Sequence, residues 1–326
     1  RPAVLIGSQE PTVGGTLSVG GFGDRTPQAG LQIEQVEAMT VATLGGELHR
    51  VGPGDALFDY VLAGRGQLGV IVEVDFRTCP LPEVMDVRAL HFPSLGSFLS
   101  TADGLLDTPL WDGMPAWWDI TTGSVEALAG RAARAWEPSR VDVPAGGELH
   151  AAEEVERIPV LAALELDDRV GRAFASPCLE VVAALPDAQR LFRRLSAELL
   201  EMGLAPFLEE GVPLAVFRRN PALPLAPAPK HHDRAVIAAV RPEMPSSDAQ
   251  RILPKLRRLA DSLLREGACL YLMSVEGTEP RFLDRQFGEA TARVFTTLKQ
   301  RFDPEGLLNP WRPMQDALLR AREAGR

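Results

Sequence analysis

The chain has 326 residues, of which 45% are hydrophobic and 24% are charged, as in a globular protein with enough apolar material for two cores. Its formal net charge of −10 argues against a nucleic-acid partner, because proteins that bind a phosphate backbone concentrate positive charge. No apolar run reaches the roughly 18 residues that a membrane span needs. We therefore expect a cytoplasmic protein without a membrane partner, and whether an export signal precedes Arg1 stays open.

A glycine-rich segment, Val13-Gly-Gly-Thr-Leu-Ser-Val-Gly-Gly21, lies close to the N-terminus. Six of its nine positions are glycine or hydroxyl residues, so a flat or anionic ligand can come close to the backbone. Thr12 is placed to cap a short helix there. The pattern predicts a cofactor loop. Because twelve residues precede Val13 and the first is Arg1, not Met, we expect the chain to begin inside a domain.

The next elements along the chain are short strands and one helix. Strands are predicted over 36–43 and 48–51, with Gly45-Gly46 as the hairpin turn between them. Asp55 is placed to cap a helix that ends near Leu62. A second glycine cluster, Gly64-Arg-Gly-Gln-Leu-Gly69, then leads into an apolar strand. Its G-x-G-x-x-G spacing matches the dinucleotide fingerprint, but it precedes a strand instead of opening a helix, so a nicotinamide site is rejected.

The Pro-rich stretch Cys79-Pro-Leu-Pro82 is the best candidate for a domain boundary. Beyond it, strands and helices alternate without parallel βαβ repeats, which predicts an α+β domain with an antiparallel sheet covered on one face by helices. The predicted strands cover 84–92, 114–121, 212–218, 235–240 and 269–275, and the predicted helices cover 95–106, 186–203, 246–267 and 282–301. The tail after Met314 is predicted to be an exposed helix.

Few side chains in this region point to chemistry by themselves. The three cysteines lie far apart and His231-His232 lacks a neighbouring carboxylate motif, so no metal site is predicted. Trp117 and Trp118 are interpreted as core or sheet-surface residues, with an aromatic wall for a substrate as the alternative.

Three stretches together carry a family resemblance. The glycine segment at 13–21, the segment 57–71 with its glycine cluster, and Phe302-Asp-Pro-Glu-Gly-Leu-Leu-Asn-Pro310 resemble the vanillyl-alcohol-oxidase-type (PCMH-type) FAD-binding oxidoreductases. Within that family the chain is most similar to cytokinin dehydrogenases. The resemblance implies three parts, namely residues 1–79 as the second half of the FAD-binding domain, 80–300 as the substrate (cap) domain, and 301–326 as a segment returning to the FAD domain.

The resemblance also implies where FAD would be held. The residues matching cofactor contacts in the family are Thr12, Gly14, Gly15, Ser18, Phe22, Gly69, Val70, Ile71, Asn309 and Arg312. The first five lie within the first glycine segment or directly beside it. The next three lie where the second glycine cluster leads into the following strand, and the last two belong to the closing segment. Both ends of the chain would therefore meet at the cofactor.

Departures from the family pattern bear on activity. Cytokinin dehydrogenases carry a catalytic Asp at the position of Gly7 and a His at the position of Ala29. Glu10 is the nearest carboxylate, and it is read first as a solvated turn residue, so the catalytic base stays unknown. Trp311 and Arg312 replace Gly and Gln. The family's first half of the FAD domain, which supplies the pyrophosphate loop, has no counterpart in this chain, so an N-terminal segment of the same protein is an expected partner.

Two functions follow from these observations. The first is an FAD-dependent oxidase or dehydrogenase that transfers hydride from a small organic amine or alcohol to the flavin. The alternative is a flavin-free binding protein, or a cofactor-independent cyclase or isomerase, on the same fold. Substrate, electron acceptor, flavin attachment and oligomeric state are not visible in the sequence.

Overall fold

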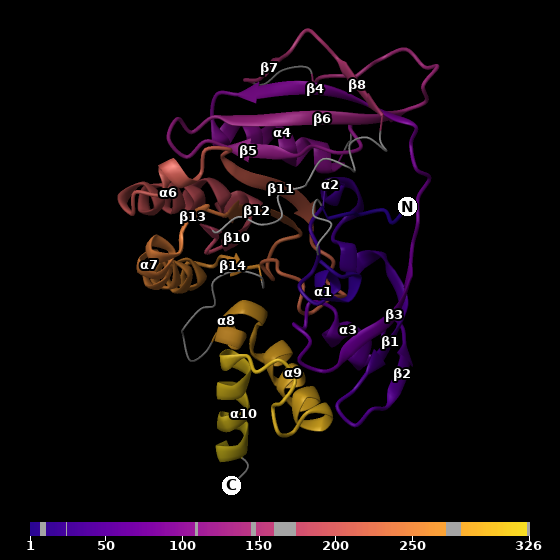
Figure 1. The fold of residues 1–326 in the computed structure, drawn as a ribbon, viewed down its shortest axis with the longest axis vertical. Helices are drawn as coiled ribbons and strands as arrows, with labels where there is room; N and C mark the ends of the chain where they lie inside the picture. Colours follow the sequence, from indigo (N-terminus) through magenta and orange to yellow (C-terminus); the bar gives the residue numbers. More distant parts are fainter. Residues whose placement is uncertain are drawn as a thin grey trace.

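The computed structural model describes residues 1–6, 11–23, 25–107, 110–144, 148–159, 174–271 and 282–324. Every strand pair in these residues is antiparallel, and helices accompany both of the larger sheets, so the fold is α+β. In the view of Figure 1 the small N-terminal sheet lies at the lower right, below the large sheet, and the C-terminal helices lie beside it, below α7 and β14.

The N-terminal unit is built around a three-stranded sheet in the order β2-β1-β3. Its elements are α1 (Val13–Leu17), α2 (Thr26–Ala29), the 3-10 helix η1 (Gln32–Gln35), β1 (Val36–Ala42), β2 (Leu48–Val51), α3 (Ala56–Val61) and β3 (Val70–Phe76). The predicted hairpin is present, and Gly46 closes its turn at φ 81° by donating to the carbonyl of Thr43. Residues 64–69 connect α3 to β3, as predicted.

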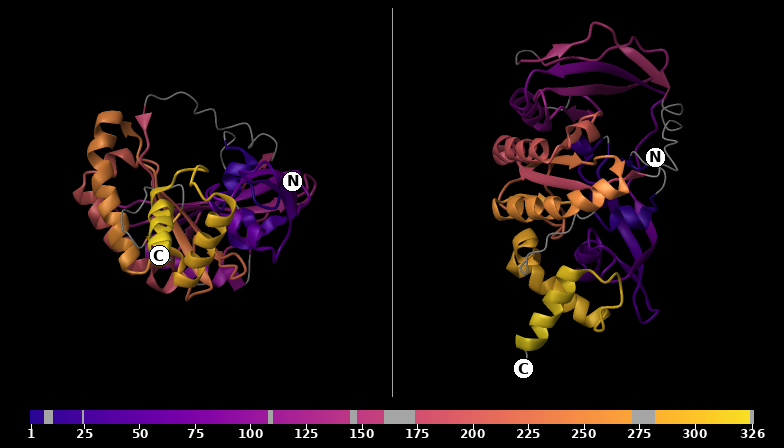
Figure 2. Two further views of the ribbon diagram at one scale, coloured as in Figure 1. Left: turned by 90° about the horizontal axis from the view of Figure 1, so that it is seen from below. Right: turned by 60° about the vertical axis from the view of Figure 1, so that its left-hand side comes forward.

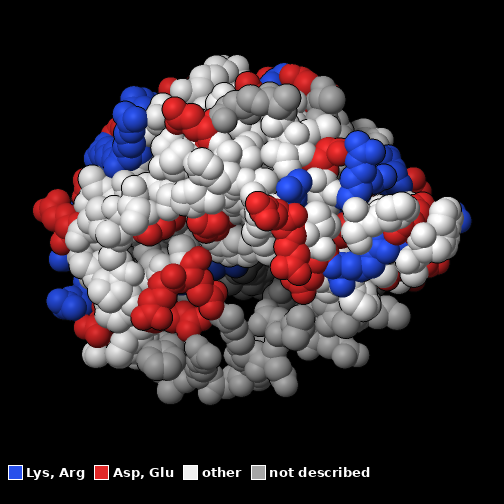
Figure 3. All heavy atoms as spheres, turned by 90° about the horizontal axis from the view of Figure 1, so that it is seen from above, with Lys and Arg blue, Asp and Glu red and all other residues white. Residues whose placement is uncertain are grey.

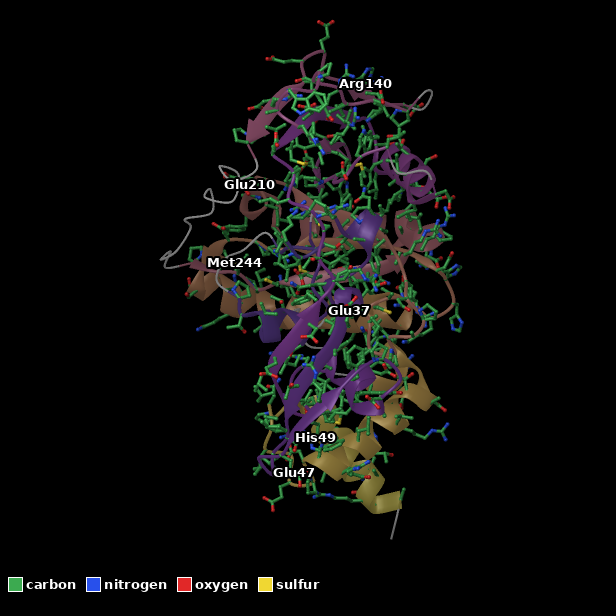
Figure 4. The ribbon with its side chains drawn as sticks, turned by 90° about the vertical axis from the view of Figure 1, so that its right-hand side faces the viewer. Glu37, Glu47, His49, Arg140, Glu210 and Met244 are labelled. Atoms are coloured by element: carbon green, nitrogen blue, oxygen red, sulfur yellow. The ribbon has the colours of Figure 1, made fainter. Side chains whose placement is uncertain are left out.

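The two faces of this small sheet differ. Alternation along β1 places Met39 and Val41 in the core. On the other face Leu48 and Val70 are 68% and 57% exposed. Figure 4 shows His49 at the far end of this sheet, where its ring meets Phe302 at 5.9 Å between centroids. The C-terminal helices therefore pack against one end of the sheet.

In the described residues the large sheet has nine strands, in the order β14-β10-β12-β11-β5-β6-β4-β7 with β8 also paired to β4. Its strands are β4 (Val84–Phe92), β5 (Ala116–Trp118), β6 (Val125–Ala133), β7 (His150–Ala151), β8 (Glu156–Pro159), β10 (Leu179–Ala184), β11 (Val212–Arg218), β12 (Arg234–Val240) and β14 (Cys269–Leu270). A separate pair joins β9 (Phe174–Ala175) to β13 (Met244–Pro245), and η2 (Ala205–Phe207) precedes β11. The predicted strand 114–121 is thus shorter than expected.

Helices cover one face of the large sheet, and the N-terminal unit lies against the other, as the two views of Figure 2 show. The covering helices are α4 (Leu95–Asp107), α6 (Leu185–Glu201) and α7 (Ser246–Arg265). Trp118 belongs to the helix side, where its ring stacks on Phe192 of α6 at 6.1 Å. Trp117, one residue earlier, points to the opposite face because side chains alternate along a strand. The two tryptophans therefore have different surroundings.

The C-terminal part consists of α8 (Phe282–Phe287), α9 (Glu289–Phe302) and α10 (Arg312–Ala324). The sequence predicts one helix over 282–301, but Gly288 divides it, because its φ of 79° lies in the left-handed region that ends a right-handed helix. Met314 and Leu318 of α10 are buried at helical spacing, while Leu319 is exposed. One side of this last helix thus packs on the protein.

Replacing Gly288 with Ala should destabilise the protein by about 1–2 kcal/mol, because a Cβ is disfavoured at positive φ. The control is Gly104→Ala on the exposed side of α4, where a Cβ meets no atom within 4 Å and should add about 0.5–1 kcal/mol. Urea unfolding of both variants measures the difference. Equal effects would show that the α8–α9 break does not depend on Gly288.

Candidate functional site

The first glycine segment folds as the short helix α1 packed on the start of β3. Thr12 caps it by accepting a hydrogen bond from the Gly15 N–H at 3.1 Å. A Cβ on Gly14 would lie 3.2 Å from the carbonyl oxygen of Ile71. The glycine thus allows α1 to approach β3 closely, while Gly15 is exposed on the other side.

The second glycine segment is bonded directly to the end of α1. Ala63 and Arg65 donate their N–H groups to the carbonyls of Leu17 and Ser18 at 2.9 and 2.8 Å. Both donors have positive φ, 56° and 53°. A Cβ on Gly69 would overlap Val41 and Ala42 of β1 at 2.6 and 2.7 Å. The two glycine segments therefore form one backbone framework.

The closing segment is held on this framework by a buried ion pair. Lys299 and Asp303 side chains are 1% and 0% exposed, and their charged atoms lie 2.7 Å apart. Lys299 Nζ also donates to the carbonyls of Gln67 at 2.8 Å and Leu308 at 2.9 Å. The Asp303 carboxylate accepts the N–H groups of Leu307 and Leu308 at 2.9 and 2.7 Å. We call this arrangement the Lys299–Asp303 latch.

The latch sets the charge state of Asp303. Burial alone raises the pKa of this carboxyl, but the hydrogen bonds from Lys299 and from two backbone N–H groups outweigh it and hold the pKa below its usual range. Asn309, the residue directly after Leu308, has φ 39° and donates its side-chain amide to the carbonyl of Arg65. The Arg65 guanidinium in turn lies over the ring of Trp311, 4.8 Å from its centroid.

The large sheet meets the first glycine segment through aromatic residues. The Phe22 ring contacts those of Phe217 in β11 and Tyr271 after β14 edge-on, at 5.1 and 4.9 Å between centroids. The Gly21 N–H donates to the Tyr271 hydroxyl at 3.0 Å. A Cβ on Gly20 would touch Tyr271 and Pro227, so the Pro-rich loop after β11 also packs here.

A cavity of about 530 Å³ lies between the glycine segment and the open face of the large sheet, and we call it the inner cavity. Most of its wall is apolar. It is lined by Ile6, Pro11, Gly15, Thr16, Val19, Phe22, Pro213, Leu214, Ala215, Ile237, Ala239, Arg241 and Tyr271. Ala215 and Ile237 are paired neighbours on β11 and β12, so the two strands present one continuous floor.

A second cavity of about 540 Å³, the outer cavity, shares Pro213 and Arg241 with the inner one. Its wall is more polar and includes Trp117, Phe207, Glu209, Glu210 and Glu243. Seen from above, the surface has a hollow with basic atoms in its depth and acidic side chains around it (Figure 3). Glu210 lies just before β11, a central strand of the large sheet, and away from the small sheet (Figure 4).

Arg241 stands where the two cavities meet and is held by Glu180 of β10. The Arg241 Nε lies 2.7 Å from Glu180 Oε1, and Nη2 bonds to the same oxygen. Burial raises the pKa of the Glu180 carboxyl, although Arg241 opposes this shift. Burial likewise raises the pKa of the Tyr271 hydroxyl far above its usual range. Tyr271 therefore stays neutral.

The structure brings several residues of the predicted FAD site together. Gly15 and Phe22 line the inner cavity, and Thr12, Gly14 and Ser18 belong to α1 or its caps beside it. Ile71, Gly69 and Val70 lie at the start of β3 under α1, and Asn309 lies on the second glycine segment. The Arg312 side chain, Gly7 and Glu10 are outside what the structure describes.

Other residues of the cavities had no signal in the sequence. Arg241 and Glu180 are 61 positions apart, and neither belongs to a motif. Only the register of β10 with β12 brings them together. Among the described residues, no group of three or more His, Cys, Asp or Glu could hold a metal ion. No helix in the same part of the chain is both long and apolar enough to cross a membrane.

No protein-family model matches the chain. It is 37% identical over 113 residues to the uncharacterized oxidoreductase ORF5 in the fasciation locus of Rhodococcoides fascians, which is 34% of this chain and 26% of the relative. It is 43% identical over 74 residues to cytokinin dehydrogenase 10 of Oryza sativa subsp. japonica (22% and 14%). For cytokinin dehydrogenase 8 of subsp. indica the identity is 37% over 102 residues (30% and 19%).

The chain thus spans about a quarter or less of the length of these relatives. Over the matched parts it is similar to proteins named as oxidoreductases, and this similarity supports an enzyme.

Replacing Lys299 with Met should cost about 3–5 kcal/mol of folding free energy, because it leaves the Asp303 carboxylate buried without its cation. Arg251→Met is the matched control, since the Arg251–Asp248 pair is exposed and should contribute about 0–1 kcal/mol. Chemical denaturation of both variants measures the two losses. Losses of the same size would show that the Lys299 variant does not leave the Asp303 carboxylate buried and unpaired.

Replacing Tyr271 with Phe should cost about 1–3 kcal/mol, because the buried Gly21 N–H loses its acceptor. The protein has two tyrosines, and Tyr60→Phe is the control. Tyr60 is half-buried, so water can replace its hydroxyl as a hydrogen-bond partner in that variant. Thermal unfolding should therefore rank the Tyr271 variant well below the Tyr60 variant. The reverse order would refute the bond as a clamp on the glycine segment.

Proposed function

We propose that this chain is part of an FAD-dependent oxidoreductase that transfers hydride from a small organic amine or alcohol to the flavin. The observation that carries the proposal is the inner cavity, because one wall is the first glycine segment and the other is the floor of β11 and β12. The partial similarity to an oxidoreductase and to cytokinin dehydrogenases supports the same chemistry. The proposal concerns the cavity that would hold the flavin ring and the substrate.

The residues present fit the ring end of FAD. Gly15 has no side chain and is exposed beside the cavity, so a flat ring could lie against its backbone. The volume of about 530 Å³ falls in the range of ligand pockets and leaves space for a substrate above a ring. The other predicted contacts do not line the inner cavity, and the resemblance implies that they would meet the rest of the cofactor: Thr12, Gly14, Ser18, Gly69, Val70, Ile71, Asn309 and the backbone of Arg312.

Bound FAD would supply the hydride acceptor, and the protein would supply position and a dry environment. Val19, Phe22 and Ile237 exclude water from the cavity wall. Tyr271 holds the Gly21 backbone in place. The catalytic base is not assigned, because Gly7 stands where the resembling family has its Asp.

The phosphates of FAD need donors beyond this cavity. Of the described residues that line it, Arg241 is the only basic one, and it is bonded to Glu180 on the sheet side. We propose that a further polypeptide segment, packed near the exposed Leu48 and Val70 of the small sheet, supplies these donors.

A second candidate is a flavin-free binding protein or a cofactor-independent cyclase or isomerase. The observation in its favour is that packing alone requires glycine at positions 14 and 69. These two glycines are therefore no evidence for a bound cofactor. Such a protein would be stabilised by a small apolar ligand and not by FAD.

The test is to express the protein from its complete gene and record its absorption spectrum. The oxidoreductase proposal expects the visible absorption bands of a bound flavin, and a higher melting temperature when FAD is added. A colourless protein that gains neither bands nor stability with added FAD would refute the proposal. Stabilisation by an apolar compound such as indole alone would favour the second candidate.

A further inference from the structure

Among the described lining residues, Arg241 is the one charged side chain shared by the inner and outer cavities. It follows β12, so its backbone is fixed by the sheet, and its side chain is 53% exposed. The floor beside it, Ala239 and Pro213, carries no charge. A ligand lying on this floor would therefore meet one cation at its outer end.

Glu180 fixes the direction of that cation. The carboxylate is 1% exposed and takes the Nε and Nη2 donors of Arg241 on a single oxygen. A guanidinium has five N–H donors, so three remain after these two bonds, including both on Nη1. Because Nε faces Glu180, the Nη1 side of the planar group points away from the buried carboxylate.

The charges around Arg241 decide what it can bind. Glu209, Glu210 and Glu243 line the outer cavity, and they disfavour an anion there. The inner cavity contains no carboxylate among its described lining residues, and its Tyr271 is neutral. Among the described lining residues, Arg241 at the shared position is therefore the one that favours an anionic group, which its guanidinium would bridge to Glu180.

We propose that Arg241 anchors a carboxylate of the substrate, whose apolar body fills the inner cavity. The inference rests on the proposed function only in calling the ligand a substrate. It narrows the substrate class to an amine or alcohol that also carries a carboxylate. Glu180 acts as a positioning residue, since it touches Arg241 and holds its fork.

The experiment is isothermal titration of the full-length protein with three probes of one shape, phenylacetate, phenylacetamide and phenethylammonium. Phenylacetate should bind at least about tenfold tighter than the neutral amide, because a charge-assisted fork is stronger than a neutral bond. Arg241→Lys keeps the charge and should lose about tenfold for phenylacetate alone. Tightest binding of phenethylammonium would overturn the proposal in favour of the acidic outer wall.

A double variant separates the loss of carboxylate binding from a loss of folding. Arg241→Met alone leaves Glu180 buried without its cation, whereas Arg241→Met with Glu180→Gln removes both charges. The double variant should bind the amide like the wild type and should lose the preference for phenylacetate. An unchanged preference would overturn the proposal. Glu180→Gln alone should weaken phenylacetate and leave the amide unaffected.

Titration detects binding whether or not flavin is present, so two failures can be told apart. A yellow protein without carboxylate preference would refute the Arg241 anchor and leave the oxidoreductase proposal standing. A colourless protein whose preference for phenylacetate depends on Arg241 would support the Arg241 anchor and refute the oxidoreductase proposal.

Discussion

The Lys299–Asp303 latch is the interaction on which the candidate site depends. It places a full charge pair where neither group reaches water, and every donor of the ammonium and both oxygens of the carboxylate have partners. A buried pair of this kind contributes little net stability when complete but costs much when one member is lost. Its role is therefore to specify geometry, because only one position of the closing segment satisfies all of these bonds.

The other contacts of the candidate site can be followed outward from the latch. Lys299 holds Gln67 of the second glycine segment, which is bonded through Ala63 and Arg65 to the end of α1. The first glycine segment then reaches the large sheet through Phe22 and through the bond of Gly21 to Tyr271. The inner cavity is the space left between these two bodies. Its shape thus depends on contacts between parts of the chain that are far apart in sequence.

The sequence predicted the local elements well and the site only in part. Apolar runs bounded by turn residues predicted β1, β3 and β11, and Thr12 was correctly predicted as a helix cap, because these features depend on neighbouring residues. The division of the helix at Gly288 was not predicted, because a single glycine within a helical pattern does not show whether its φ will be positive. The FAD contacts stay predictions: packing accounts for Gly14 and Gly69, while Gly15 and Phe22 do face the cavity. Arg241 with Glu180 could not be foreseen, because strand register alone pairs them.

The span of the bond between Gly21 and Tyr271 has a consequence for folding kinetics. The two residues are 250 positions apart, and Lys299 and Gln67 are 232 apart. Contacts across such distances require closure of long loops, which slows their formation relative to hairpins and helices. The small sheet and the helix-covered sheet can each form from nearer residues. We therefore expect the cavity between them to be completed late in folding, so that a ligand that fills it binds an already assembled chain.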